Sequence, residues 1–316
     1  MELSSAIAAA RAVEQGFSSS INVSGPPGFR SGVRALAPSE YDFPEGLLRL
    51  PNCPPALFVR GHSAPIPQPI QCVAIIGSRR ASSRSLHLAR DLARGLAEEG
   101  VCVVSGLALG IDAAAHQGAL QGGGQTLAVL ASAVDQPTPH RHVVLAERIL
   151  EQRGWLVSER PPCAAVRAWQ FPRRNRLVAA LSCLVIVVEA GLRSGTMSTV
   201  EHALGLGIEV AAVPGPAGSP ACAGSNALLR RGAQWIESVE DALRSIGREA
   251  TVKRVSSPDD PDEVAVLGGL TAREGSVERW MKESGLPREA AGRALSRLVC
   301  RGFLRRLPGG RVGRVL

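Results

Sequence analysis

The residues with the most evident chemical potential lie in the segment Phe171–Arg176, which reads F-P-R-R-N-R. It places three guanidinium groups and one amide within four residues, just before the apolar run that ends at Val188. Arginine donates forked, charge-assisted hydrogen bonds to phosphate and stays protonated in proteins. The cluster therefore favours an extended anionic ligand over a small neutral metabolite. A solvated basic loop with no ligand accounts for these six residues equally well.

Polar, glycine-rich segments also follow four apolar runs that are typical of buried strands. These segments begin at Gly77, Ser105, Glu189 and Pro214. In an open parallel sheet, ligands bind outside the carboxyl ends of the strands. Glycine lets the backbone approach an anion, and serine and arginine donate to it. Four such loops together with the arginine cluster predict a phosphate-binding edge.

The elements that must position these loops follow from an alternation of apolar runs and amphipathic stretches. Residues 72–76 form a continuous apolar run, which is typical of a strand buried on both faces. Leu88, Leu92 and Leu96 then recur at helical spacing. The repetition of this alternation predicts an α/β fold with a parallel sheet covered by helices on both faces. Strands are predicted at 72–76, 101–104, 126–130, 155–158, 183–188 and 209–213, and helices at 84–99, 110–120, 142–152 and 196–206.

Changes in composition divide the chain into four parts. Residues 1–37 are predicted to be a poorly ordered or helical extension, because an alanine-rich stretch precedes a segment rich in serine, glycine and proline. Residues 38–247 form the main domain, and the polar residues 248–262 form a linker. Residues 263–316 form a second, small domain.

The small domain has the pattern of a winged helix. Helices predicted at 276–283 and 288–301 flank a short turn and precede a hairpin. Residues 263–316 hold eleven lysines and arginines against five glutamates. This charge allows the second helix to lie along DNA. Small winged helices also dock proteins, and the sequence leaves both roles open.

Composition limits the class of partner. The formal net charge is +8, which favours a polyanionic partner. None of the seven cysteines belongs to a C-x-x-C pair, so neither a metal site nor a disulfide framework is predicted. No signal peptide and no apolar run of about 18 residues is found, so we expect a cytoplasmic protein with no membrane span.

Five strings in the chain resemble the DNA processing protein A (DprA/Smf) family. They are I-G-S-R, S-G-L-A-x-G-I-D-x-x-x-H, F-P-R-R-N-R, E-A-x-x-x-S-G-T and V-P-G-P, and the match covers about residues 38–246. The resemblance implies an extended Rossmann-like domain that binds single-stranded DNA without a cofactor or catalytic turnover, usually as a homodimer. It also implies protection of incoming single strands and loading of the RecA recombinase during natural transformation.

The resemblance can be carried over to individual residues. It implies that DNA faces Gly77, Ser78, Arg79, Ser105, Gly106, Arg173, Arg174, Asn175, Arg176, Ser194, Gly195 and Thr196. The chain departs from the family pattern at Leu109 and Ile208, where relatives commonly carry cations, and at Gln136, where they carry tyrosine. Fewer cations would weaken the DNA groove.

Some acidic and aromatic residues have alternative interpretations. We expect Asp112 and His116, one helical turn apart, to hydrogen bond and fix their loop rather than act as an acid–base couple. Glu189 and Glu201 flank the S-G-T turn. A similar turn occurs in nucleoside-monophosphate phosphoribohydrolases of the Lonely-guy type, which makes such an enzyme the alternative function. Trp169 and Phe171 could stack on bases or pack against the sheet.

Overall fold

The computed structural model describes residues 21–22, 32–249, 260–268, 274–300, 303–307, 309 and 311–314. The chain divides into two units between residues 250 and 251. Most of the predicted N-terminal extension and most of the predicted linker lie outside the described residues. Among the described helices, none is both long enough and apolar enough to cross a membrane.

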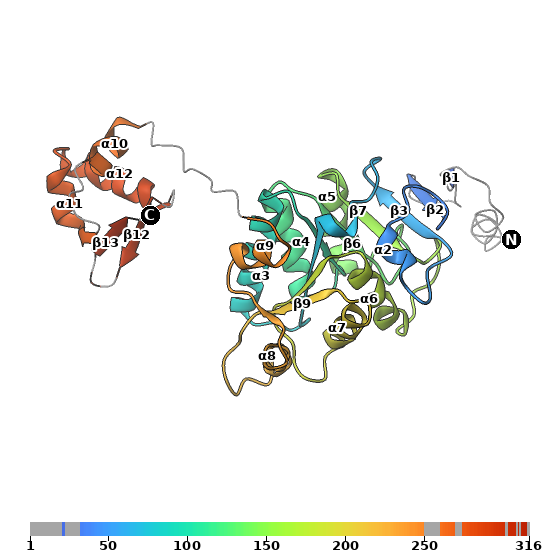
Figure 1. Ribbon diagram of the computed structural model, residues 1–316. Coiled ribbons are helices and arrows are strands. Elements are labelled where there is room, and N and C mark those ends of the chain that lie inside the picture. Colours follow the sequence, from blue (N-terminus) through green and yellow to red (C-terminus); the bar gives the residue numbers. More distant parts are fainter. Residues whose placement is uncertain are drawn as a thin grey trace. The chain divides into compact units, whose positions relative to one another are not determined.

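The first unit is built on a sheet in which ten strands are described, in the order β1-β2-β3-β7-β6-β5-β4-β8-β9-β10 (Figure 1). The strands from β4 to β10 pair in parallel, which confirms the predicted Rossmann-like α/β fold. The bounds are β1 Ile21–Asn22, β2 Val33–Leu36, β3 Leu57–Gly61, β4 Cys72–Ile76, β5 Cys102–Ser105, β6 Thr126–Val129, β7 Trp155–Ser158, β8 Leu184–Val187, β9 Glu209–Ala212 and β10 Gln234–Trp235.

An antiparallel edge extends this sheet beyond the predicted strands. β3 pairs with β7, and β2 pairs with β3, both antiparallel. Val33 and Ala35 of β2 are fully buried, so the folded unit begins before residue 38. The frequent prolines between residues 38 and 69 concealed β3, because they break up the alternation that identifies a strand.

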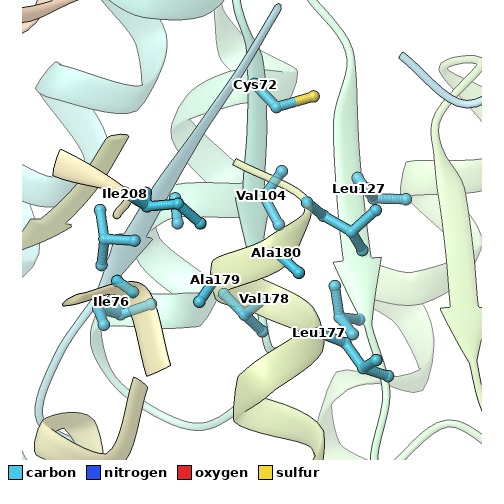
Figure 2. Close-up of a cluster of buried hydrophobic side chains, with 14 of the residues drawn as sticks. Cys72, Ile76, Val104, Leu127, Leu177, Val178, Ala179, Ala180 and Ile208 are labelled. Carbon is cyan, nitrogen blue, oxygen red and sulfur yellow. The ribbon is translucent and has the colours of Figure 1, made fainter. Parts of the chain in front are cut away.

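Helices cover both faces of the sheet, and alternate side chains of β4 show how. Cys72, Ala74 and Ile76 face one apolar cluster, whereas Val73 and Ile75 face another. Figure 2 shows the first cluster, in which residues 177–180 of α6 lie beside strand residues. The second cluster packs α3, α4 and α9. The helices of this unit are α2 Glu45–Leu48, α3 Ser83–Glu98, α4 Ile111–Gln121, α5 Val143–Glu151, α6 Gln170–Ala180, α7 Gly195–Gly205, α8 Ala223–Arg230 and α9 Val239–Ser245, with one-turn 3-10 helices η1 Pro69–Gln71 and η2 His140–His142.

The arginine cluster lies on α6, so the interpretation as a solvated basic loop is wrong. Pro172 stands in the first turn of α6, where its missing N–H would have no helical partner. Arg174 and Arg176 are buried, and so are residues 177–180. The apolar half of α6 is anchored in the core, which fixes the direction of the preceding basic turn.

The second unit has its own small core. Trp280, Leu298 and Val312 are buried together. The predicted helix pair and hairpin are present, and the unit also holds a further helix and a third strand. Its helices are α10 Pro261–Gly268, α11 Val277–Glu283 and α12 Arg288–Cys300, and its antiparallel sheet has the order β11-β13-β12, with β11 Glu274–Ser276, β12 Leu304–Leu307 and β13 Arg311–Arg314. Assignment as a winged helix stays a prediction.

Candidate nucleic-acid interface

A hollow of about 470 Å³ opens at the carboxyl edge of the parallel strands, and we call it the switch-point hollow. β4 pairs with β5 on one side and with β8 on the other, so the direction of the chain through the sheet reverses there. Ligands of open α/β sheets bind at such a point. Nine of the twelve predicted site residues line it: Gly77, Ser78, Arg79, Gly106, Arg174, Asn175, Ser194, Gly195 and Thr196.

The loop after β4 is fixed by backbone contacts. The Ser78 N–H donates to the carbonyl of Glu189 over 2.7 Å, and the Ser78 carbonyl accepts from the N–H of Ile111 over 3.2 Å. A Cβ at Gly77 would lie 2.6 Å from Cγ1 of Ile111, so this position excludes larger residues. The contacts tie the ends of β4 and β8 to the start of α4. They leave Arg79 exposed, with its guanidinium carbon 5.5 Å from the ring centre of Phe171.

Glu189 has a structural role in this loop. Its buried carboxylate accepts from the Ser82 hydroxyl over 2.8 Å and from the Ser82 N–H over 3.2 Å. A negative carboxylate at this position also stabilises α3, because the N-terminal end of a helix carries partial positive charge. Glu201 is exposed, and neither glutamate lines the switch-point hollow. The pair of carboxylates that a Lonely-guy-type enzyme would use is therefore not gathered in the hollow.

The N-terminus of α7 supplies a second wall. Ser194 Oγ accepts from the N–H of Thr196 over 3.1 Å and caps the helix. Asn175 Nδ2 donates to the carbonyl of Gly195 over 3.2 Å, which joins α6 to α7. A Cβ added at Gly195 would have no atom within 4 Å, so the side of this residue where a Cβ would stand is open. Since the first N–H groups of a helix attract anions, this end suits a phosphate.

Arg174 lies beneath the hollow as a buried cation. Its Nη1 donates to the carbonyl of Gly106 over 2.6 Å and also to that of Val129. A Cβ at Gly106 would lie 2.6 Å from the guanidinium carbon, so glycine is needed there. Burial lowers the pKa of Arg174 to about 10, and the charge of Asp112 opposes this shift. Arg174 is therefore cationic at neutral pH and joins the ends of β5 and β6.

Asp112 lines the hollow beside Arg174. One carboxylate oxygen accepts from the N–H groups of Gly106 over 3.1 Å and of Ala108 over 3.3 Å. Burial raises the pKa of Asp112, while Arg174 and these N–H groups oppose the rise. The carboxylate holds the loop after β5 in place, and its charge is countered by the arginine next to it.

The predicted hydrogen bond between Asp112 and His116 is wrong. Nδ1 of His116 lies 2.7 Å from the hydroxyl of Thr126, which donates in turn to the carbonyl of Val103 over 2.6 Å. The Thr126 oxygen must then accept from His116 Nδ1, which fixes the neutral tautomer. The two residues share a helical face, but Asp112 turns to loop N–H groups whereas His116 turns to β6.

This buried histidine predicts a pH-dependent stability. Burial lowers the pKa of His116 to about 3, and the charges of His142 and Arg174 add to the effect. Between pH 6.5 and 3 the unfolded chain therefore binds more protons than the folded one. The contribution of this group lowers the protein's free energy of unfolding by about 1.4 kcal/mol for each unit by which the pH falls. We expect thermal denaturation of His116→Gln to show a shallower acid slope than the parent over that window. Parallel curves would contradict the assignment.

Three predicted residues lie away from the hollow. Arg173 Nε is 3.3 Å from Glu159, and Arg176 pairs with the same carboxylate. Ser105 Oγ is buried and donates to the carbonyl of Ile75 over 2.7 Å. The Arg173 guanidinium also lies 5.7 Å from the ring centre of Trp169. The basic helix therefore divides its arginines, with Arg174 under the hollow and the other two beside Glu159.

The structure also brings in residues that the sequence argument missed. Arg80, Asp112 and Thr199 line the hollow. The position of Arg80, directly after the I-G-S-R string, was the available signal for it. Within the described residues no three His, Cys, Asp or Glu side chains gather into a metal site. The hollow thus combines exposed and buried cations, N–H groups and one carboxylate, Asp112, whose charge is countered by Arg174.

Gly110 gives a test of how the loops are held. Its φ is +81°, and a Cβ there would lie 2.2 Å from the carbonyl oxygen of Ser78. We expect Gly110→Ala to lower the free energy of unfolding by about 2–4 kcal/mol. An alanine would be strained at this φ, and the loop that holds Ser78 would have to shift to make room for its Cβ. Gly123, with a φ of +69° and nothing within 4 Å, is the control. Chemical denaturation showing equal losses for Gly110→Ala and Gly123→Ala would contradict the clash.

Comparison with known proteins identifies the family. The model of the family DNA recombination-mediator protein A matches residues 34–247. The chain belongs to this family. The match confirms the resemblance recognised from the five strings, and the family's description names a mediator of recombination rather than an enzyme.

Individual relatives that carry the Smf and DprA names support the same family assignment. Protein Smf of Escherichia coli is 37% identical over 293 residues, 88% of this chain and 76% of that protein. A relative from Mycobacterium tuberculosis strain H37Rv that carries the DprA name is 44% identical over 207 residues, 66% of this chain and 52% of that protein. The chain thus spans about half the length of the mycobacterial relative. A solved structure of DNA processing protein A from Helicobacter pylori, concerned with its single-stranded DNA binding mode, has a TM-score of 0.58 at 30% identity, covering 68% of this chain and 95% of that one.

Proposed function

We propose that the chain is a mediator of recombination that binds single-stranded DNA in the switch-point hollow. The observation that carries the proposal is the gathering of Arg79, Arg80 and buried Arg174 with the N-terminus of α7 in one hollow at the reversal point of the sheet. The solved Helicobacter pylori relative, whose structure concerns single-stranded DNA binding, supports the same ligand class.

The mechanism is electrostatic. Arg79 is exposed and donates directly to a phosphate, while the N–H group of Gly195, at the start of α7, donates to a neighbouring oxygen. Arg174 contributes charge from beneath and keeps the loops after β5 and β6 in position. Phosphate contacts do not distinguish bases, so binding is sequence-tolerant and depends strongly on salt.

The proposal includes a biological role. The chain protects incoming single strands and loads the RecA recombinase on them during natural transformation, acting as a homodimer in the cytoplasm. Membership of a recombination-mediator family and the similarity to Smf support this role. Turnover of a nucleotide is not part of it, and incubation with AMP is expected to yield no free base. Release of adenine that is lost in Glu201→Gln would favour the Lonely-guy-type alternative instead.

Fluorescence anisotropy tests the DNA-binding step. A labelled oligo-dT strand and a duplex of the same length are titrated with the full chain at two salt concentrations. We expect tighter binding to the single strand and a linear fall of log K with log salt. Equal affinity for the duplex, or binding insensitive to salt, would contradict the proposal.

The RecA step needs a separate assay. The rate at which RecA assembles on a single strand coated by a single-strand-binding protein is measured with and without the chain. Faster nucleation is the expected result. An unchanged rate, with DNA binding intact, would remove RecA loading from the proposal and leave strand binding standing.

A further inference from the structure

A large aromatic residue stands exposed next to the switch-point hollow. Trp169 directly precedes α6 and is 53% exposed. Phe171, two residues further along, lines the hollow. Two residues span at most about 7 Å of chain, so the backbone of Trp169 lies close to the rim of the hollow. Trp169 itself is not among the residues that line it.

Hydrogen bonds within a tight turn hold this tryptophan at the surface. The N–H of Gln170 donates to the carbonyl of Arg167 over 3.1 Å, and Oε1 of Gln170 accepts from the N–H of Arg167 over 2.6 Å. Gln170 is buried, whereas residues 165–169 are exposed in succession. The sequence left open whether Trp169 packs against the sheet, and its exposure decides against that packing.

An arginine covers part of the exposed indole. Arg173 lies one turn further along α6, and its guanidinium carbon is 5.7 Å from the ring centre of Trp169. Nε of Arg173 is 3.3 Å from a carboxylate oxygen of Glu159, which restrains the arginine. A cation over an aromatic ring is attracted to its face. Arg173 therefore steadies the indole from one face, while half of the residue stays open to solvent.

The charge around Trp169 favours an anionic occupant. Residues 160–176 include five arginines and no aspartate or glutamate. Of these arginines, Arg167 and Arg173 are exposed close to the tryptophan. A surface of one charge sign attracts ligands of the opposite sign. A ligand that combines negative charge with flat rings matches both the arginines and the indole.

A single strand held in the switch-point hollow is such a ligand. Its phosphates carry the charge, and every base has a flat face that can stack on an aromatic side chain. Nucleotides on either side of the bound phosphate extend past the rim of the hollow, where Trp169 stands. In a duplex the bases are already stacked on one another, so this contact is available only to a single strand.

We propose that Trp169 stacks on a base of the single strand whose phosphates bind in the switch-point hollow, with Arg173 supporting the indole. The inference rests on the proposed function, since it requires a bound strand. It adds a contribution from the bases to binding that is otherwise electrostatic. Because any base can stack, this contribution selects single strands over duplexes without selecting a sequence.

Fluorescence anisotropy with two labelled strands tests the inference. The probes are oligo-dT and an abasic strand of the same length, which carries the same phosphates without bases. We expect the full chain to bind oligo-dT more tightly than the abasic strand. Trp169→Ala should weaken binding of oligo-dT about tenfold and leave both the affinity for the abasic strand and the salt slope unchanged. Trp169→Phe, which keeps an aromatic face, should recover most of the loss.

Tyr41→Ala is the matched control. Tyr41 is 98% exposed and follows β2 on the antiparallel edge of the sheet. Its removal takes an exposed aromatic ring from the same unit, and both affinities should equal those of the parent. Arg79→Ala, in contrast, should weaken the binding of both strands, because it removes a phosphate contact. The two classes of variant thus separate stacking from charge.

The outcomes also separate this inference from the proposed function. A parent-like affinity of Trp169→Ala for oligo-dT overturns the inference and leaves strand binding intact. Equal losses on both strands overturn it too, because Trp169 would then act only by positioning Arg173. Failure of the parent to bind oligo-dT overturns the proposed function and the inference with it. Melting temperatures show whether each variant is folded, and Trp169→Leu, which keeps apolar volume without an aromatic face, replaces Trp169→Ala if that variant is not.

Discussion

Arg174→Ala is expected to abolish measurable single-strand binding at moderate salt and to lower the melting temperature. Arg174 is buried and donates to the carbonyls of Gly106 and Val129, and its charge counters that of Asp112. Removal leaves these acceptors without their cation, a change that costs about 3–5 kcal/mol for a buried charged group. The melting temperature should fall by on the order of 10 °C. The loss of stability follows from the burial of this side chain, which the sequence alone did not reveal.

Arg174→Lys is the matched variant. It retains the positive charge but cannot reproduce the forked geometry. We expect partial recovery of the affinity for oligo-dT, measured by anisotropy, and incomplete recovery of the melting temperature. A parent-like melting temperature in Arg174→Ala would contradict the role of this arginine as the link between the β5 and β6 loops.

Arg79→Ala is expected to weaken binding without changing stability. The side chain is exposed, lines the switch-point hollow and packs over Phe171. Loss of one charge-assisted contact should reduce the affinity for oligo-dT about tenfold at low salt. The slope of log K against log salt should become shallower by roughly 0.7.

The control for Arg79 is Arg94→Ala. Arg94 is exposed near the C-terminal end of α3 and forms an i,i+3 ion pair with Asp91. The Arg94→Ala substitution removes the same charge from the same unit, away from the hollow. Both variants should melt at the parent's temperature. Equal losses of affinity in the two variants would show that net charge, rather than the hollow, governs binding.

The buried parallel strands could be predicted from the sequence because their signal is local. The run at residues 72–76 is apolar throughout, since its alternate side chains enter two separate clusters. The antiparallel edge formed by β2 and β3 could not, because both strands are short, prolines flank β3 closely, and its pairing with β7 joins segments about a hundred residues apart.

The loops that form the site could be predicted from the sequence, but the ion pairs and hydrogen bonds of their side chains could not. The rule that ligands bind at the carboxyl ends of parallel strands brought Gly77, Gly106 and Gly195 together correctly. The sequence could not show that Glu159 forms ion pairs with Arg173 and Arg176, or that the Glu189 carboxylate accepts a hydrogen bond from Ser82. Such partners depend on the path of the chain in space.

Photocrosslinking tests the central claim most directly. The full chain is irradiated in complex with an oligo-dT strand that carries bromodeoxyuridine, and the modified peptides are mapped by mass spectrometry. We predict crosslinks at Phe171, which lines the switch-point hollow, and in the segment 77–80. Crosslinks confined to residues 261–314, with none on the carboxyl edge of the large sheet, would contradict the account.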